Sequence, residues 1–180
     1  MSNSCFVNHR DEFISNMMAM LTGGTSNDVK IVLSDGEIQA NKDVLSAQSD
    51  YFATMFSNNK VKFIEGETNT VKFPHCSKNI MERIVKYLFS GEMKLYDMSL
   101  SDLVTMLNIT NMMMLVALKD DIQKHLLKRT ENHMGDSFLD LVKSLMLAEQ
   151  LKLDTIKTAL VRELYKSIVD VAVDSNFKAA

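Results

Sequence analysis

The chain has 180 residues, of which 46% are hydrophobic, and a formal net charge of -3. Its basic residues are dispersed, so the charge pattern excludes an obvious nucleic-acid surface, and one proline with six glycines argues against an all-β or disordered chain. This length suits one domain, or one domain with a small appendage, and it is sufficient to bury a core.

An amphipathic helix is predicted near the N-terminus, over residues 11–21, and Gly23-Gly24 ends it. Its apolar side chains recur at helical spacing and form one wide stripe. The stripe contains Phe13, Ile14, Met17, Met18 and Leu21. Because this helix stands behind a flexible joint, it docks either on its own domain or on another subunit.

A β-hairpin follows. The β-branched run 29–33 predicts a strand, Asp35-Gly36 predicts a tight turn, and 37–40 predicts the return strand. Asn41 and Ser49 are then expected to cap two short helices, which reach about Gln48 and Phe56.

The middle of the chain predicts a loop, a strand and a helix. Residues 58–69 are polar and aperiodic, and 70–73 form a strand that Pro74 stops. Ser77 begins a helix with regular apolar spacing that ends at Gly91. Residues 92–95 could add a short strand.

Four helices complete the chain. The periodicity predicts helices over 101–112 and 115–127, then, after a polar joint, over 137–150 and 154–171. The last two are expected to form an antiparallel hairpin through facing apolar residues. These are Leu141, Leu145, Ala148 and Leu151 on one helix and Ile156, Leu160, Leu164 and Ile168 on the other. The fold class is therefore α+β: a small mixed sheet of three to four strands packed with several helices, followed by an α-helical hairpin.

Catalytic and metal-binding patterns are missing from the sequence. The neighbours His75 and Cys76 point to opposite sides of an extended segment, and no second Cys/His pair stands at zinc-finger spacing. No Ser, His and Asp set has the context of a hydrolase. We therefore expect a protein that is not an enzyme and needs no metal or cofactor.

The sequence also suggests where the protein resides. The longest uncharged stretch, 103–118, is short for a membrane span and contains two asparagines. The N-terminus lacks a secretory signal, and the two scattered cysteines suit a reducing compartment. We expect an intracellular protein, cytoplasmic or nuclear, that does not bind membranes or, directly, nucleic acid.

A binding surface is the better candidate for function. The loop 58–69 places Phe63 and Ile64 among charged residues. Exposed apolar groups on a loop mark either a contact site or a tucked anchor. Glu65 could cap the loop or pair with a partner.

The ordered motifs of the chain resemble a BTB/POZ domain over residues 24–128. They are Asp28-Val29, Gly36, Ala40-x-Lys42, Val44-Leu45, Ser49-x-Tyr51-Phe52, Met55-Phe56, Val71-x-Phe73, Tyr87-Leu88-Phe89-Ser90-Gly91, Met106-Leu107, Met112-Met113-x-Leu115, Leu118 and Leu126. Residues 137–180 resemble the helical extension of many members, a three-box or the start of a BACK domain. Residues 1–23 would then be an N-terminal dimerisation region.

The resemblance implies a homodimer. In such domains an N-terminal helix packs on the partner subunit, which would place Phe13, Ile14, Met17, Met18 and Leu21 in the interface. Packing within one chain is the alternative. Asp28 and Lys42 match paired charges near that interface, although simple surface charges would explain them too.

The resemblance also implies a partner, cullin-3, because many such proteins are adaptors of ubiquitin ligases. Members of the family carry a three-residue motif in this loop: a hydrophobic residue, then any residue, then glutamate. Phe63-Ile64-Glu65 matches this motif. Phe63 would fill a groove and Glu65 would pair at its rim. Met55, Phe56 and Phe89 lie where the family's groove forms, and they are equally explained as core residues.

Two functions follow as hypotheses. The first is the cullin-binding part of a ubiquitin-ligase substrate adaptor, whose substrate binds a module outside this chain. The alternative is the oligomerisation and corepressor-binding module of a transcriptional regulator. The helical extension favours the first.

Overall fold

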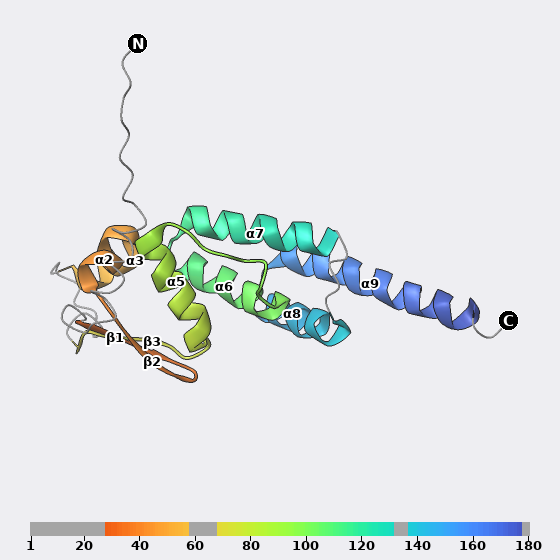
Figure 1. Cartoon of the computed structure of the whole chain (residues 1–180), viewed down its shortest axis with the longest axis horizontal. Helices are drawn as coiled ribbons and strands as arrows, with labels where there is room; N and C mark the ends of the chain where they lie inside the picture. The colour runs from red at the N-terminus through yellow and green to blue at the C-terminus, as the bar shows by residue number, and fades with distance from the viewer. Residues whose placement is uncertain (1–27, 58–67, 132–136, 178–180) are drawn as a thin grey trace, which may run out of the picture. The chain divides into compact units, whose positions relative to one another are not determined.

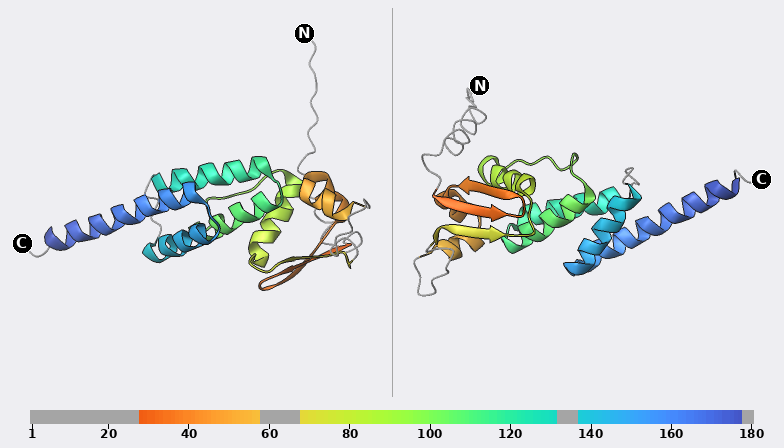
Figure 2. Two further views of the ribbon diagram at one scale, coloured as in Figure 1. Left: turned by 180° about the vertical axis from the view of Figure 1, so that it is seen from behind. Right: turned by 90° about the horizontal axis from the view of Figure 1, so that it is seen from below.

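The computed structural model describes residues 28–57, 68–131 and 137–177, with side chains described as far as Asp170. The helix predicted over 11–21 and most of the predicted loop 58–69 lie outside these residues. The chain divides into two compact units, one up to Met93 and one from Lys94 on. Figures 1 and 2 show the elements of each unit.

The first unit contains a three-stranded mixed sheet of order β2-β1-β3, visible in the right view of Figure 2. The central strand β1 (Val29–Leu33) pairs antiparallel with β2 (Gly36–Ala40) and parallel with β3 (Thr70–Phe73). Side chains of β1 alternate between buried and half-buried, as a strand with two unequal faces requires. The predicted α+β class and the three predicted strands are confirmed.

The hairpin turn lies one residue earlier than predicted. Leu33 pairs with Gly36, so Ser34 and Asp35 form the loop and Gly36 begins the return strand. Gly36 has φ +153°, a conformation that side-chain-bearing residues rarely adopt. Both loop residues also bond to the chain at or just before the start of helix α5 (Lys78–Ser90). The Ser34 hydroxyl donates to the Cys76 carbonyl (3.0 Å), and the Asp35 carboxylate accepts from the Lys78 amide (2.6 Å).

Three helices of the first unit are described: α2 (Lys42–Gln48), α3 (Asp50–Phe56) and α5 (Lys78–Ser90). Their predicted N-caps Asn41, Ser49 and Ser77 each accept a bond from the backbone amide three residues on. Gly91 ends α5 in the left-handed conformation at φ 70°. Helix α5 packs against α2 and β2.

The fourth strand proposed over 92–95 is not found in the structure, where these residues take no regular form. The reason is local. The Ser90 hydroxyl accepts from the Glu92 amide and donates to the Glu92 carbonyl, both at 3.1 Å. Both backbone groups of Glu92 are thereby occupied by a side chain, which competes with pairing to a strand.

The described residues of the second unit form four helices: α6 (Leu100–Met112), α7 (Val116–Glu131), α8 (Phe138–Gln150) and α9 (Asp154–Phe177). They form two helical hairpins, α6 with α7 and α8 with α9, and α8 also lies against α6 and α9 against α7. The division between the compact units falls inside the predicted domain 24–128, so the predicted boundaries at 128 and 137 remain predictions. Helix α9 extends well beyond α8 (Figure 1).

The residues predicted to face one another in the α8–α9 hairpin are buried or half-buried, with the exception of Ile168. Leu141, Ala148, Ile156 and Leu160 are buried, whereas Ile168 is 52% exposed. Ile168 was expected to face α8. Its side chain is instead exposed to solvent.

The Asp140 carboxylate on α8 bonds to the start of α6. Asp140 accepts hydrogen bonds from the backbone amides of Leu100 (2.9 Å) and Ser101 (3.4 Å) and from the Ser101 hydroxyl (2.9 Å). These amides belong to the first turn of α6, where donors lack partners within the helix. A negative charge there also complements the helix dipole.

We expect Asp140→Ala to lower the free energy of unfolding by about 1–2 kcal/mol, because it removes a cap and leaves amides of a part-buried helix end unpaired. Urea unfolding followed by circular dichroism would measure the loss. Asp121→Ala is the matched control, since Asp121 is exposed and forms an exposed ion pair with Lys124 of the same helix. Equal stability of the two variants would contradict this role for Asp140.

Candidate protein-interaction surfaces

The predicted charge pair, Asp28 and Lys42, is in contact within one chain. The Asp28 carboxylate accepts a hydrogen bond from the backbone amide of Lys42 at 2.8 Å. Lys42 is the first residue of α2, so Asp28 caps this helix together with Asn41. The lysine ammonium lies elsewhere, 5.1 Å from the centroid of the Phe56 ring, within the range of a cation–π interaction.

Two of the three groove residues are largely inside the first unit. Met55 is 7% exposed and Phe56 is 8% exposed, and the Phe56 ring stacks on Phe52 at 5.9 Å with an interplanar angle of 7°. Phe89, near the end of α5, is half-buried. Of the three, Phe89 therefore presents the most surface to a partner.

The remaining predicted contact residues lie outside the residues that the structure describes. They are Phe63 and Glu65 of the loop and Phe13, Ile14, Met17, Met18 and Leu21 of the N-terminal helix. Their positions rest on the sequence alone, so these roles remain predictions.

The adjacent His75 and Cys76 differ in exposure, although they lie in a turn after β3 and not in the predicted extended segment. The Cys76 side chain is fully buried, whereas His75 is exposed. Burial, with a smaller contribution from the charge of Asp35, raises the pKa of the Cys76 thiol to about 12. This thiol is therefore protonated and inert at neutral pH. Within the described ranges, no group of three or more His, Cys, Asp or Glu residues is placed to hold a metal ion.

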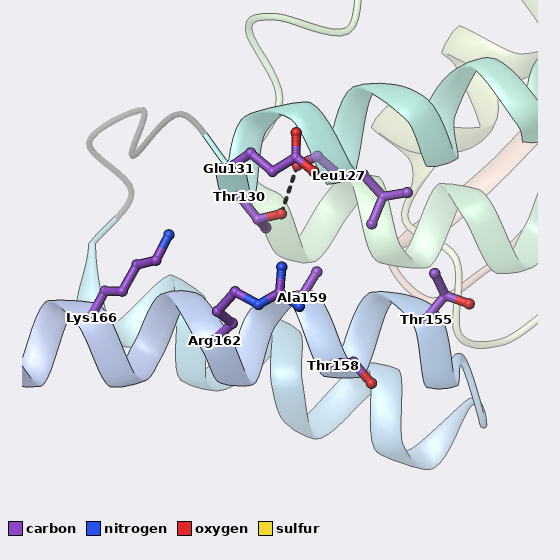
Figure 3. A pocket seen from close by; sticks show the side chains of 8 residues that line it. All are labelled: Leu127, Thr130, Glu131, Thr155, Thr158, Ala159, Arg162 and Lys166. Atoms are coloured by element: carbon purple, nitrogen blue, oxygen red, sulfur yellow. Dashed lines mark hydrogen bonds between the residues drawn. The ribbon is translucent and has the colours of Figure 1, made fainter.

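A groove of about 350 Å³ runs between α7 and α9 in the second unit (Figure 3). Its floor is formed by small side chains of α9, Thr155, Thr158 and Ala159. Arg162 and Lys166 extend from α9 toward α7, which contributes Glu131. The hydroxyls of Thr130 and Thr158 bond to backbone carbonyls of their own helices. The lining thus combines two cations, one carboxylate and methyl groups, a composition that holds no nucleophile paired with a base.

Large apolar side chains are exposed along the α8–α9 hairpin, and the sequence reading did not single them out as a surface. They are Phe138, Leu139 and Met146 on α8 and Val161, Tyr165, Ile168 and Val169 on α9, each at least 39% exposed. The spacing 161, 165, 168 gives a second apolar stripe on α9, away from the stripe that contains Ile156 and Leu160. A count of apolar residues per helix face would have revealed it.

No described helix is both long enough and apolar enough to cross a bilayer. This holds for the stretch 103–118, which spans α6, its turn and the start of α7.

Comparison with known proteins identifies the class of protein. The model of the BTB/POZ domain matches residues 17–130, which is more than half of the chain. The chain therefore belongs to the BTB/POZ family, whose domain is a protein–protein interaction module.

Three relatives are informative. The human Rho-related BTB domain-containing protein 2 is 39% identical over 71 residues, 39% of this chain and 9% of that protein. Kelch repeat and BTB domain-containing protein 1 of cowpox virus (strain GRI-90 / Grishak) is 23% identical over 172 residues, 96% of this chain and 28% of that protein. Human Kelch-like protein 4 is 29% identical over 98 residues, 54% of this chain and 13% of that protein. The matched region thus spans less than a third of each relative.

Among solved structures, the BTB domain of human gigaxonin superimposes with a TM-score of 0.48 and 20% sequence identity. The superposition covers 69% of this chain and 98% of the gigaxonin domain.

His125 of α7 is a half-buried histidine that lies near other cations. Its Nε2 atom is buried and, among the described residues, has no hydrogen-bond partner. Burial and the nearby charges of Arg129 and Lys128 lower the pKa of His125 below its ordinary 6.5. The folded protein therefore holds this imidazole neutral more strongly than the unfolded chain does.

We expect acid to destabilise the fold partly through His125. The unfolded chain takes up a proton near its ordinary pKa of 6.5, which the folded chain resists, so stability is complete above this pH and falls below it. Urea midpoints at about pH 7.5 and about pH 5 should differ less in His125→Gln than in the wild type. His75→Gln, at an exposed site, should keep the wild-type difference, and an unchanged difference in His125→Gln would contradict the prediction.

Proposed function

We propose that this chain is a homodimeric adaptor module that binds cullin-3 and belongs to the substrate-recognition part of a ubiquitin ligase. The observation that carries the proposal is the position of Phe63-Ile64-Glu65. Glu65 stands six residues before Val71 of β3, and β3 pairs with the central strand of the sheet. An aromatic anchor followed by a carboxylate is a suitable contact for a groove with a polar rim.

The relatives support an adaptor. The names of the cowpox protein and of human Kelch-like protein 4 refer to Kelch repeats. A substrate-binding module outside the matched region fits an adaptor, because this chain would then supply assembly and cullin contact while the module selects the substrate. In this proposal the protein has no catalytic activity of its own and acts in the cytoplasm or nucleus.

The helical hairpin α8–α9 is proposed to be the three-box or the first part of a BACK domain, over residues 137–180. Its contacts with α6 and α7 and the Asp140 cap support a role as an extension of the BTB domain. Corepressor binding in a transcriptional regulator is the competing function, and no contact in the described residues favours it.

The cullin contact is tested by substituting Phe63→Ala together with Glu65→Ala. Calorimetric titration with the cullin-3 N-terminal domain should show affinity weaker by at least about 2 kcal/mol, roughly 30-fold, because hot-spot truncation loses a buried anchor and its charge partner. The control pair Tyr96→Ala with Asp121→Ala removes an exposed aromatic and an exposed carboxylate in the second unit. Equal affinity of both double variants, or no binding by the wild type, would overturn the proposal.

The homodimer is tested by light scattering. The wild type should have a mass of about 41 kDa, twice the 20.4 kDa of one chain. Ile14→Glu with Met18→Glu should return it to the mass of one chain, because two charges in an apolar interface have no compensating partner. Ser15→Glu with Asn16→Glu is the control on the polar side of the same predicted helix. A dimer that survives the first pair would remove the helix from the interface.

A further inference from the structure

Lys42 is held at both ends by contacts within the first unit. Its backbone amide donates to the Asp28 carboxylate at 2.8 Å, and the backbone amide of Val44, two residues further on, donates to the Asn41 side chain at 3.0 Å. The main chain at the start of α2 is therefore fixed by two side-chain acceptors. Its ammonium then lies 5.1 Å from the centroid of the Phe56 ring.

Phe56 is the last residue of α3, a helix of seven residues. So short a helix is marginal by itself and depends on packing. Phe56 stacks on Phe52, which is fully buried, and Tyr51 contacts both Phe52 (5.2 Å) and Phe73 of β3 (6.3 Å). These ring contacts connect α3 to strand β3 of the sheet. Lys42 contacts Phe56, the last ring of the series.

We infer that Lys42 is a positioning residue that orders the last turn of α3 and so fixes where the chain leaves this helix. After Ser57 the chain enters the segment that contains Phe63 and Glu65. The effect on α3 follows from the described contacts, whereas its consequence for cullin-3 rests on the proposed function. A lysine that served only as a surface charge would have neither effect.

Two substitutions separate the cation from the rest of the side chain. Lys42→Met keeps an unbranched chain of similar length and removes the charge, and Lys42→Arg keeps a cation that interacts well with aromatic rings. Lys72→Met is the matched control, because Lys72 is exposed on β3. None of the three removes a core side chain.

The direct measurement is amide hydrogen exchange of Thr54, Met55 and Phe56. Lys42→Met should accelerate it about 2- to 5-fold, the factor expected for a cation–π contact at a partly exposed site. Lys42→Arg and Lys72→Met should exchange at nearly the wild-type rate. Unchanged exchange in Lys42→Met, or exchange in Lys42→Arg as fast as in Lys42→Met, would overturn the role of the cation.

The second measurement is affinity for the cullin-3 N-terminal domain. Lys42→Met should weaken binding by a similar factor, about 2- to 5-fold, and Lys42→Arg should preserve it. If the wild type binds and Lys42→Met binds equally well, the link from Lys42 to the binding loop is overturned. If the wild type does not bind, the cullin proposal fails, and hydrogen exchange alone then decides whether Lys42 orders α3.

Discussion

Three helix starts in this protein depend on carboxylates that come from elsewhere in the chain. Asp28 caps α2, Asp35 caps α5, and Asp140 caps α6. Each satisfies amides that the helix itself leaves without partners and places a negative charge at the positive end of the helix dipole. Because each carboxylate belongs to another element, capping also fixes how two elements meet: the entry to β1 with α2, the hairpin turn with α5, and α8 with α6.

This dependence explains which parts of the fold the sequence could predict. Helix caps that bond to an amide three residues further along the chain could be predicted from the sequence. Asn41, Ser49 and Ser77 are such caps, and each acts as predicted. Asp35 was read only as a turn residue, because its bond to Lys78 spans 43 positions. The turn also lies one residue earlier than predicted, with Ser34 and Asp35 in the loop. The proposed strand over 92–95 failed for the opposite reason, since a bond from Ser90 only two residues away satisfies Glu92.

The sequence predicted which residues form the candidate binding surfaces, but it did not predict their exposure or their contacts. Periodicity could not decide whether Met55 and Phe56 are exposed, and both are almost fully buried. Nor could it show that Lys42 turns its amide toward Asp28 and its ammonium toward Phe56. Such contacts depend on how α2, α3 and the entry to β1 meet in space. Family resemblance identified the domain because an ordered set of motifs is specific even where each motif is weak.

The pairing of α8 with α6 and of α9 with α7 has a consequence for where the domain can be divided. The family match ends at residue 130, yet the helices that lie against its last two helices follow that point. A chain ended there would lose both covering helices and the carboxylate at the start of α6, and would expose apolar side chains to water. The end of the family match at residue 130 therefore falls inside the second compact unit, which begins at Lys94 and includes the α8–α9 hairpin.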